Sequence, residues 1–426
     1  MLSDLALRFR RVTASGTYVP QIDGLRFLAI MPVLFFHAGL RGARISSDPA
    51  ANEALMTAWL PAGGVGVSLF FFISGYIIAY PFLIDRAPAL GHFYTRRLMR
   101  LEPPYFIVMI GCFLLLSLYT PSSAPNFDYT PVPLWQSLLA SLTYTHGIVF
   151  GQNPKLNPPA WSLEIEMQFY LVAPFLIWAY LRIRRRTTRL WVGAATCVAG
   201  LLLGETIRHY VGQYQSIYHT ILAQSYCFIL GVLICDHSVK TQPFLRPARQ
   251  NYDYGLLCGL FGLLLTGVFE PRINGLGLAD PAAGTLYGSL NAVVRAVSIC
   301  LIFFGAARGA RGRAFLANPW LTLIGGACYS IYLVHLPVSH AAAEIVKRVM
   351  RPDSLLSAAA VCWIILIPLS IAIGLLFYVL VERPCMRPDW PANLTGCVKR
   401  LVSGVRGRVT RDSSPITIDP GAPVVK

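Results

Sequence analysis

Ten apolar runs, each about long enough to cross a bilayer, dominate this sequence. A transmembrane helix needs about 20 predominantly apolar residues. Only 13% of the residues are charged, whereas a soluble protein has about 25%. The sequence therefore predicts an all-α polytopic membrane protein with about ten transmembrane helices. The runs lie at 22–40, 62–84, 104–120, 162–181, 190–206, 218–237, 254–272, 284–306, 319–340 and 356–381.

The basic residues predict how these helices are oriented. If the ten runs cross and both termini are cytoplasmic, 26 of the 36 lysines and arginines lie on the cytoplasmic side, as the positive-inside rule requires. A further apolar run at 134–149 is short. If it crossed, the arginine-rich stretch 182–186 would lie outside. We therefore expect 134–149 to form a re-entrant or surface segment.

Two segments are expected, a membrane domain at 1–387 and a basic, disordered cytoplasmic tail at 388–426. The start of the chain lacks the pattern of a cleaved signal peptide. The net charge of +16 is spread over loops, which argues against nucleic acid as a partner. The ten cysteines form neither a CxxC pair nor a Cys/His cluster, so no metal site or disulfide framework is expected.

Arg26 and His37 lie within or at the edge of the first apolar run. A charge inside a membrane helix costs at least about 2.5 kcal/mol, so such residues usually face the protein interior. Eleven residues make about three helical turns, which places both side chains on one face, roughly 16 Å apart. The plain alternative is an interfacial arginine and a histidine in a helix contact.

Arg97 and Arg100 precede the third run in the stretch RRLMRLEPPY. Residues three apart are neighbours on a helix, so the two guanidinium groups could hold one phosphate. A basic topology signal is the plainer interpretation.

Other chemistry-capable residues lie toward the outer side. Glu164 and Glu166 are two apart and point in opposed directions on a helix, so only one can face a common interior. Tyr329, Tyr332 and His335 lie three residues apart and share one face of the expected helix. Such a row of side chains more often serves packing than catalysis. Two histidines, one intramembrane carboxylate and an arginine pair suggest a phosphate-bearing donor at one face and a general base near the other.

With these residues in place, the sequence resembles the membrane acyltransferase-3 family of bacterial O-acetyltransferases. The motifs match in order over nearly the whole chain. They are IDGLR followed by His37, FFFISGYII at Phe70–Ile78, RRLMRLEPPY, WSLEIEMQFY with Glu166, YSIYLVHLP with His335, and VERP at Glu382. The chain departs from some members because no periplasmic esterase-like domain is visible in it.

The resemblance implies transfer of an acetyl or other short acyl group from cytoplasmic acyl-CoA, most often acetyl-CoA, with no metal. Because CoA is too polar to cross the bilayer, we expect the helices to surround a central tunnel, lined by the first, third, fifth and last spans of the expected set. His37 would be the general base or, less readily, the acyl carrier, and His335 a second candidate base. Glu166 would orient His37 or hold the acceptor. Arg26, Arg97 and Arg100 would bind the CoA.

The sequence does not identify the acceptor. An O-antigen, an exopolysaccharide, a lipid-linked oligosaccharide or a secreted macrolide would fit a bacterial inner-membrane enzyme. A proton-coupled transporter or a glycan flippase would use the same intramembrane residue types. The oligomeric state is not predicted.

Overall fold

The structure, a computed structural model, describes residues 9, 18–46, 48–118, 132–212, 215–350 and 354–386. Within these ranges the regular elements are helices, and the only β pairing is an isolated bridge between Arg249 and Gly309. The predicted all-α class is confirmed. The tail expected at 388–426 lies outside the described residues.

The helices of the first half are α2 (Pro20–Ile45), α3 (Pro49–Trp59), α4 (Gly64–Leu83), α5 (Leu90–Leu118), α6 (Leu134–Leu142), α7 (His146–Phe150), α8 (Trp161–Leu181) and α9 (Arg186–Thr206). Those of the second half are α10 (Ser225–Thr241), α11 (Asn251–Ala279), α12 (Pro281–Arg308), α13 (Ala310–Leu316), α14 (Pro319–Gly326), α15 (Cys328–Met350), α16 (Leu355–Phe377) and α17 (Arg383–Cys385). Short π-helical turns continue α9 at Ile207–Val211 and α16 at Tyr378–Glu382.

In the part of the chain that the structure describes, seven helices are long and apolar enough to cross a membrane, and the bent pair α14–α15, with its 71° break, makes up to eight. The two further expected spans coincide with α8 and α10. Helix α8 carries two glutamates, which lower its hydropathy, and α10 has 17 residues. The segment at 134–149 forms two short helices, α6 and α7, rather than one spanning helix.

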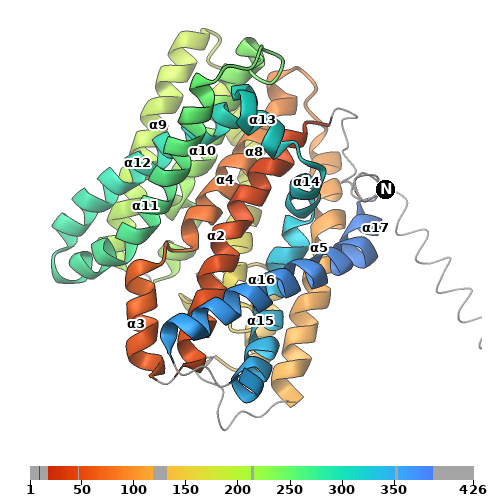
Figure 1. Cartoon of the computed structure of the whole chain (residues 1–426). Helices are drawn as coiled ribbons and strands as arrows, with labels where there is room; N and C mark the ends of the chain where they lie inside the picture. Colours follow the sequence, from red (N-terminus) through yellow and green to blue (C-terminus); the bar gives the residue numbers. More distant parts are fainter. Residues whose placement is uncertain are drawn as a thin grey trace, which may run out of the picture.

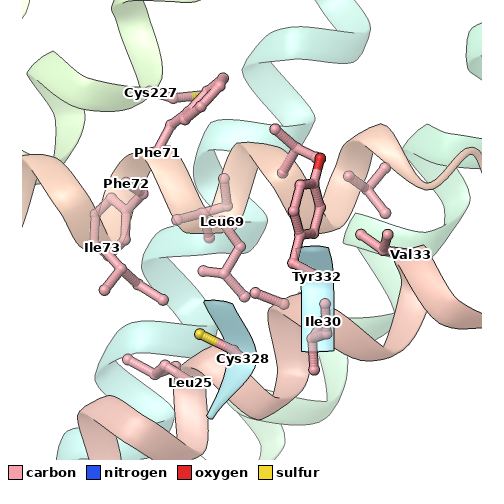
Figure 2. Packing of buried hydrophobic residues seen from close by; sticks show 14 of the residues in the cluster. Leu25, Ile30, Val33, Leu69, Phe71, Phe72, Ile73, Cys227, Cys328 and Tyr332 are labelled. Atoms are coloured by element: carbon pink, nitrogen blue, oxygen red, sulfur yellow. The ribbon is translucent and has the colours of Figure 1, made fainter. Parts of the chain in front are cut away.

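Helix α2 is the central helix of the bundle (Figure 1). It contacts α4, α14, α15 and α16, and α16 crosses it obliquely. Helices α9 to α12 form a second group on one side of it. Buried apolar side chains from α2, α4, α10 and α15 share one core, in which Leu25 and Ile30 of α2 lie near Cys328 and Tyr332 of α15 (Figure 2). This packing fixes the rotation of α2 about its own axis.

Prolines inside two helices free carbonyl groups that other segments then bind. A proline has no N–H, so the carbonyl four residues earlier loses its helical partner. Pro337 of α15 frees Leu333, whose oxygen accepts from Asn157 Nδ2 at 2.9 Å. Pro271 of α11 frees Gly267, whose oxygen accepts from the N–H of Ala62 at 3.1 Å. The loop before α8 and the link between α3 and α4 are thereby fixed to the bundle.

Glycines allow α4 and α10 to touch through their backbones. A Cβ atom at Gly75 would lie 2.2 Å from the oxygen of Phe228, and one at Gly231 would lie 2.2 Å from the oxygen of Phe72. Close helix packing through small residues is typical of membrane proteins. Gly75 belongs to the Ser-Gly motif of the second apolar run, so the motif's glycine has a packing role.

A buried ionic network joins α9, α11 and α12. The carboxylate of Glu270 accepts from Arg208 Nη1 at 2.8 Å and from Arg295 Nη2 at 2.7 Å, and Glu205 lies 3.5 Å from Arg208 Nε. Inside a bilayer such charges usually pair with one another. The network therefore has a structural explanation that needs no ligand.

Candidate active site

His37 and His335 meet in the interior of the bundle. The Nδ1 atom of His37 lies 3.2 Å from Nε2 of His335, although 298 residues separate them in sequence. The fixed rotation of α2 and the packing of α15 against it bring the two rings together. His335 is fully buried and His37 is partly buried.

The backbone contacts of the two rings determine where their protons lie. His335 Nδ1 is 2.6 Å from the carbonyl oxygen of Tyr332, and His37 Nδ1 is 3.0 Å from that of Val33. A carbonyl can only accept, so both Nδ1 atoms carry hydrogen in the neutral rings. Nε2 of His335 is then an acceptor for the Nδ1–H of His37. The lone pair of His37 lies on Nε2, which makes no hydrogen bond among the described residues.

A polar contact between α15 and the start of α8 supports this pair. The hydroxyl groups of Tyr332 and Ser162 lie 2.7 Å apart, and the Tyr332 hydroxyl also donates to the oxygen of Pro159 at 2.7 Å. Tyr332 lies beside Ile30 and Val33 of α2 (Figure 2). The serine of the Trp-Ser-Leu motif therefore fixes the helix turn that carries His335.

Arg26 lies on the same helix as His37, about three turns away. It forms an ion pair with Asp23, and both side chains are largely buried. Arg26 also lies in the neighbourhood of Tyr170 of α8. The arginine therefore faces the protein interior, as its position within an apolar run predicts.

Glu166 and Arg97 share Tyr170 as a neighbour. The Glu166 carboxylate accepts hydrogen bonds from the hydroxyl groups of Ser74 and Tyr170. The guanidinium group of Arg97 lies over the rings of Phe93, at 4.5 Å, and Tyr170, at 4.7 Å. The serine of the Ser-Gly motif thus has a partner, a contact that the sequence alone did not suggest. Glu166 has no hydrogen bond to His37 among the described residues.

Arg100 has a different partner from Arg97. Its Nη2 atom lies 3.5 Å from Glu382, whose buried carboxylate also accepts from the backbone N–H and the hydroxyl of Ser330. Glu382 therefore links the end of α16 to the start of α15 and to α5. The two arginines remain close enough to interact electrostatically.

Glu164 has a structural role. Its side chain is buried and accepts from the backbone N–H of Gly147 at 2.9 Å, at the first turn of α7. The carboxylate therefore holds the α6–α7 segment against α8. Of the two glutamates, only Glu166 lies beside the other candidate site residues.

The site thus has two parts, separated by about three turns of α2. One part holds Arg26, Arg97 and Glu166 around Tyr170, and the other holds His37 and His335 beside Tyr332. Tyr170 and Tyr332 belong to the same buried core, which connects the two parts. A cationic part can bind a phosphate-bearing molecule, and a histidine with a free Nε2 can accept a proton.

Sequence comparisons identify proteins with the same domain. A family model described as an acyltransferase domain matches residues 19–379. The peptidoglycan O-acetyltransferase OatA of Listeria monocytogenes is 26% identical over 223 residues, which are 50% of this chain and 30% of that protein. A provisionally named O-acetyltransferase of Staphylococcus aureus is 25% identical over 342 residues, 75% of this chain and 50% of that protein.

A third relative, provisionally named the peptidoglycan O-acetyltransferase YrhL of Bacillus subtilis, is 23% identical over 357 residues, 76% of this chain and 49% of that protein. These matches therefore span half or less of the relatives' own length. No solved structure matches the chain. Because the family model covers most of the sequence, this multi-pass membrane protein belongs to the acyltransferase-3 family.

Proposed function

We propose that the protein transfers an acetyl group from cytoplasmic acetyl-CoA to a hydroxyl group of a glycan on the opposite side of the membrane. The contact that carries this proposal is the hydrogen bond between His37 Nδ1 and His335 Nε2. It leaves Nε2 of His37 free to accept a proton, on the helix that also carries Arg26.

The donor would enter beside the arginines. The CoA phosphates need cations, and Arg97 and Arg100 offer two guanidinium groups at one end of α5. The rise along α2 between Arg26 and His37 is about 16 Å. An extended pantetheine arm is about as long, so the thioester could reach His37 through a tunnel. This tunnel, open to the cytoplasm beside the arginines and narrow near His37, is part of the proposal.

In the chemical step, His37 Nε2 removes the proton from the acceptor hydroxyl. The hydroxyl oxygen attacks the thioester carbonyl, the carbon–sulfur bond breaks, and the proton passes from the imidazolium to the departing thiolate. His335 holds His37 in the required tautomer. An acetyl-histidine intermediate would be the alternative route through the same side chain.

The acceptor would be an envelope glycan. Two of the relatives carry names that specify peptidoglycan, and O-antigen, exopolysaccharide and lipid-linked oligosaccharide offer similar hydroxyl groups. The decisive experiment gives the purified protein labelled acetyl-CoA and envelope glycans. Acceptor-dependent release of CoA with labelled glycan supports the proposal. Glycan or proton movement without CoA release would identify a flippase or a carrier instead.

Replacing both donor-side arginines tests the phosphate site. Arg97→Lys/Arg100→Lys should weaken acetyl-CoA binding about tenfold, because lysine cannot reproduce the planar, stacked contacts of arginine. Dissociation constants measured by calorimetry check this. Arg96→Lys is the matched control, since Arg96 is exposed and, among the described residues, its side chain has a hydrogen-bond contact with His92 alone. Unchanged affinity in the double variant would mean that the two arginines do not bind CoA and serve only as a basic topology signal.

Labelling single cysteines tests the proposed orientation, with both termini cytoplasmic. The range 40–44 is largely buried at the end of α2, so the outer probe belongs at the exposed Ala50 or Ala51, at the start of α3. In a background without native cysteines, a cysteine there should react from outside the cell, and one at 183–186, between α8 and α9, from the cytoplasm. An impermeant maleimide on intact cells and on inverted vesicles measures this. Labelling of both positions from one side would contradict the transmembrane donor scheme.

A further inference from the structure

Arg41 is a buried cation without an ion-pair partner. Only 7% of it is exposed, and among the described residues it makes neither an ion pair nor a side-chain hydrogen bond. Buried arginines are normally paired, because an uncompensated charge is expensive to remove from water. Arg41 therefore needs a counter-charge, and the described part of the chain does not supply one.

The nearest carboxylates are otherwise engaged. Glu53 of α3 binds Arg44 through two hydrogen bonds, of 2.9 and 2.6 Å, and the hydrogen bond from Arg44 lowers the pKa of Glu53. Glu344 of α15 is exposed to solvent. Both interact with Arg41 only over longer distances. The two arginines, about one turn apart on α2, thus differ in their pairing, since Arg44 binds a carboxylate and Arg41 binds none among the described residues.

Arg41 lies next to the histidine pair. It is four residues beyond His37, hence on the same face of α2 and about 6 Å farther along the axis. It interacts electrostatically with His37 and with His335 and His340 of α15. Cys362 of α16 also lies near Arg41. The free cation therefore lies on the side of the proposed base away from Arg26.

We propose that Arg41 binds the carboxylate of an acidic sugar in the acceptor glycan. This inference rests on the proposed function and specifies its substrate class. A donor thioester that arrives past Arg26 reaches His37 from one side, which leaves the Arg41 side for the acceptor. One guanidinium fork matches one carboxylate in a bidentate contact. A phosphate dianion is the poorer match for a single free cation.

Equilibrium binding of three small sugars to the detergent-purified full chain tests this proposal. N-acetylmuramic acid differs from N-acetylglucosamine by a lactyl ether group, which carries the carboxylate, and N-acetylglucosamine 6-phosphate carries a phosphate instead. We expect the carboxylate sugar to bind at least about tenfold more tightly than the neutral one, the usual effect of a charged hydrogen bond. Arg41→Gln should remove this preference, and Arg41→Lys should retain part of it.

The control is the double variant Arg44→Gln/Glu53→Gln, which removes the neighbouring ion pair without releasing the Glu53 carboxylate toward Arg41. It should keep the preference. Arg41→Gln should melt no lower than the wild type, because it removes an unpaired buried charge. Equal binding of the acidic and neutral sugars, tighter binding of the phosphate sugar, or a preference that survives Arg41→Gln would each overturn the proposal.

Acetyl-CoA binding and transfer, measured in the same preparation, separate this proposal from the function on which it rests. If the wild type fails to bind or use acetyl-CoA but distinguishes the sugars through Arg41, the acetyltransferase proposal fails and the acidic-sugar site stands. If acetyl transfer proceeds and Arg41→Gln slows acidic and neutral acceptors alike, Arg41 acts on a group common to all acceptors. The acidic-sugar assignment is then wrong.

Discussion

Replacing His37 with alanine should reduce acetyl transfer by about 10²–10⁴-fold, the usual loss when a general base is removed. His37 offers a free Nε2 atom on a helix whose rotation the core fixes, and no other described histidine shares this contact with His335. The loss should appear in kcat, because His37 lies away from the arginines that would hold CoA. Initial rates with labelled acetyl-CoA measure it.

The variant must remain folded and bind the donor for this result to be informative. His237→Ala is a suitable control, since His237 is exposed near the end of α10 and should have a wild-type rate. If His37→Ala retains more than about a tenth of the activity at normal expression, another group is the base. Acetyl-histidine trapped on wild-type protein without acceptor would instead indicate the covalent route.

Much of the fold could be predicted from hydropathy and charge. Each of the ten expected runs corresponds to a helix or to the bent pair α14–α15. This success has a physical basis, because a bilayer tolerates few backbone arrangements besides the helix. The opposed directions of Glu164 and Glu166 followed from helical geometry alone, and the structure separates their surroundings in that way.

The partners of the site residues could not be predicted, because they depend on contacts between distant segments. The hydrogen bonds between His37 and His335, and between Ser74 and Glu166, join different helices. Glu270, which binds two arginines, gave no signal either. The expected first span ends at residue 40 and so leaves Arg41 outside it, but α2 continues to Ile45 and buries Arg41. The end of an apolar run does not mark the end of a helix.

Replacing His335 with leucine should lower kcat by up to about 10⁴-fold, the loss seen when the group that orients a catalytic histidine is removed. The Nε2 atom of His335 accepts from Nδ1 of His37, 3.2 Å away. Without that acceptor, only the carbonyl of Val33 holds the Nδ1–H tautomer of His37. A positioning role predicts loss in kcat, with an unchanged dissociation constant for acetyl-CoA.

His335→Gln separates positioning from structure and from direct catalysis. The glutamine amide oxygen can take the place of Nε2 and accept from Nδ1 of His37, but an amide cannot act as a base near neutral pH. It should therefore recover at least about tenfold of the activity lost in His335→Leu. Recovery identifies His335 as the residue that orients His37. Two equally inactive variants that are folded and bind acetyl-CoA would make His335 itself the base, whereas loss of donor binding in both would show that its role is structural.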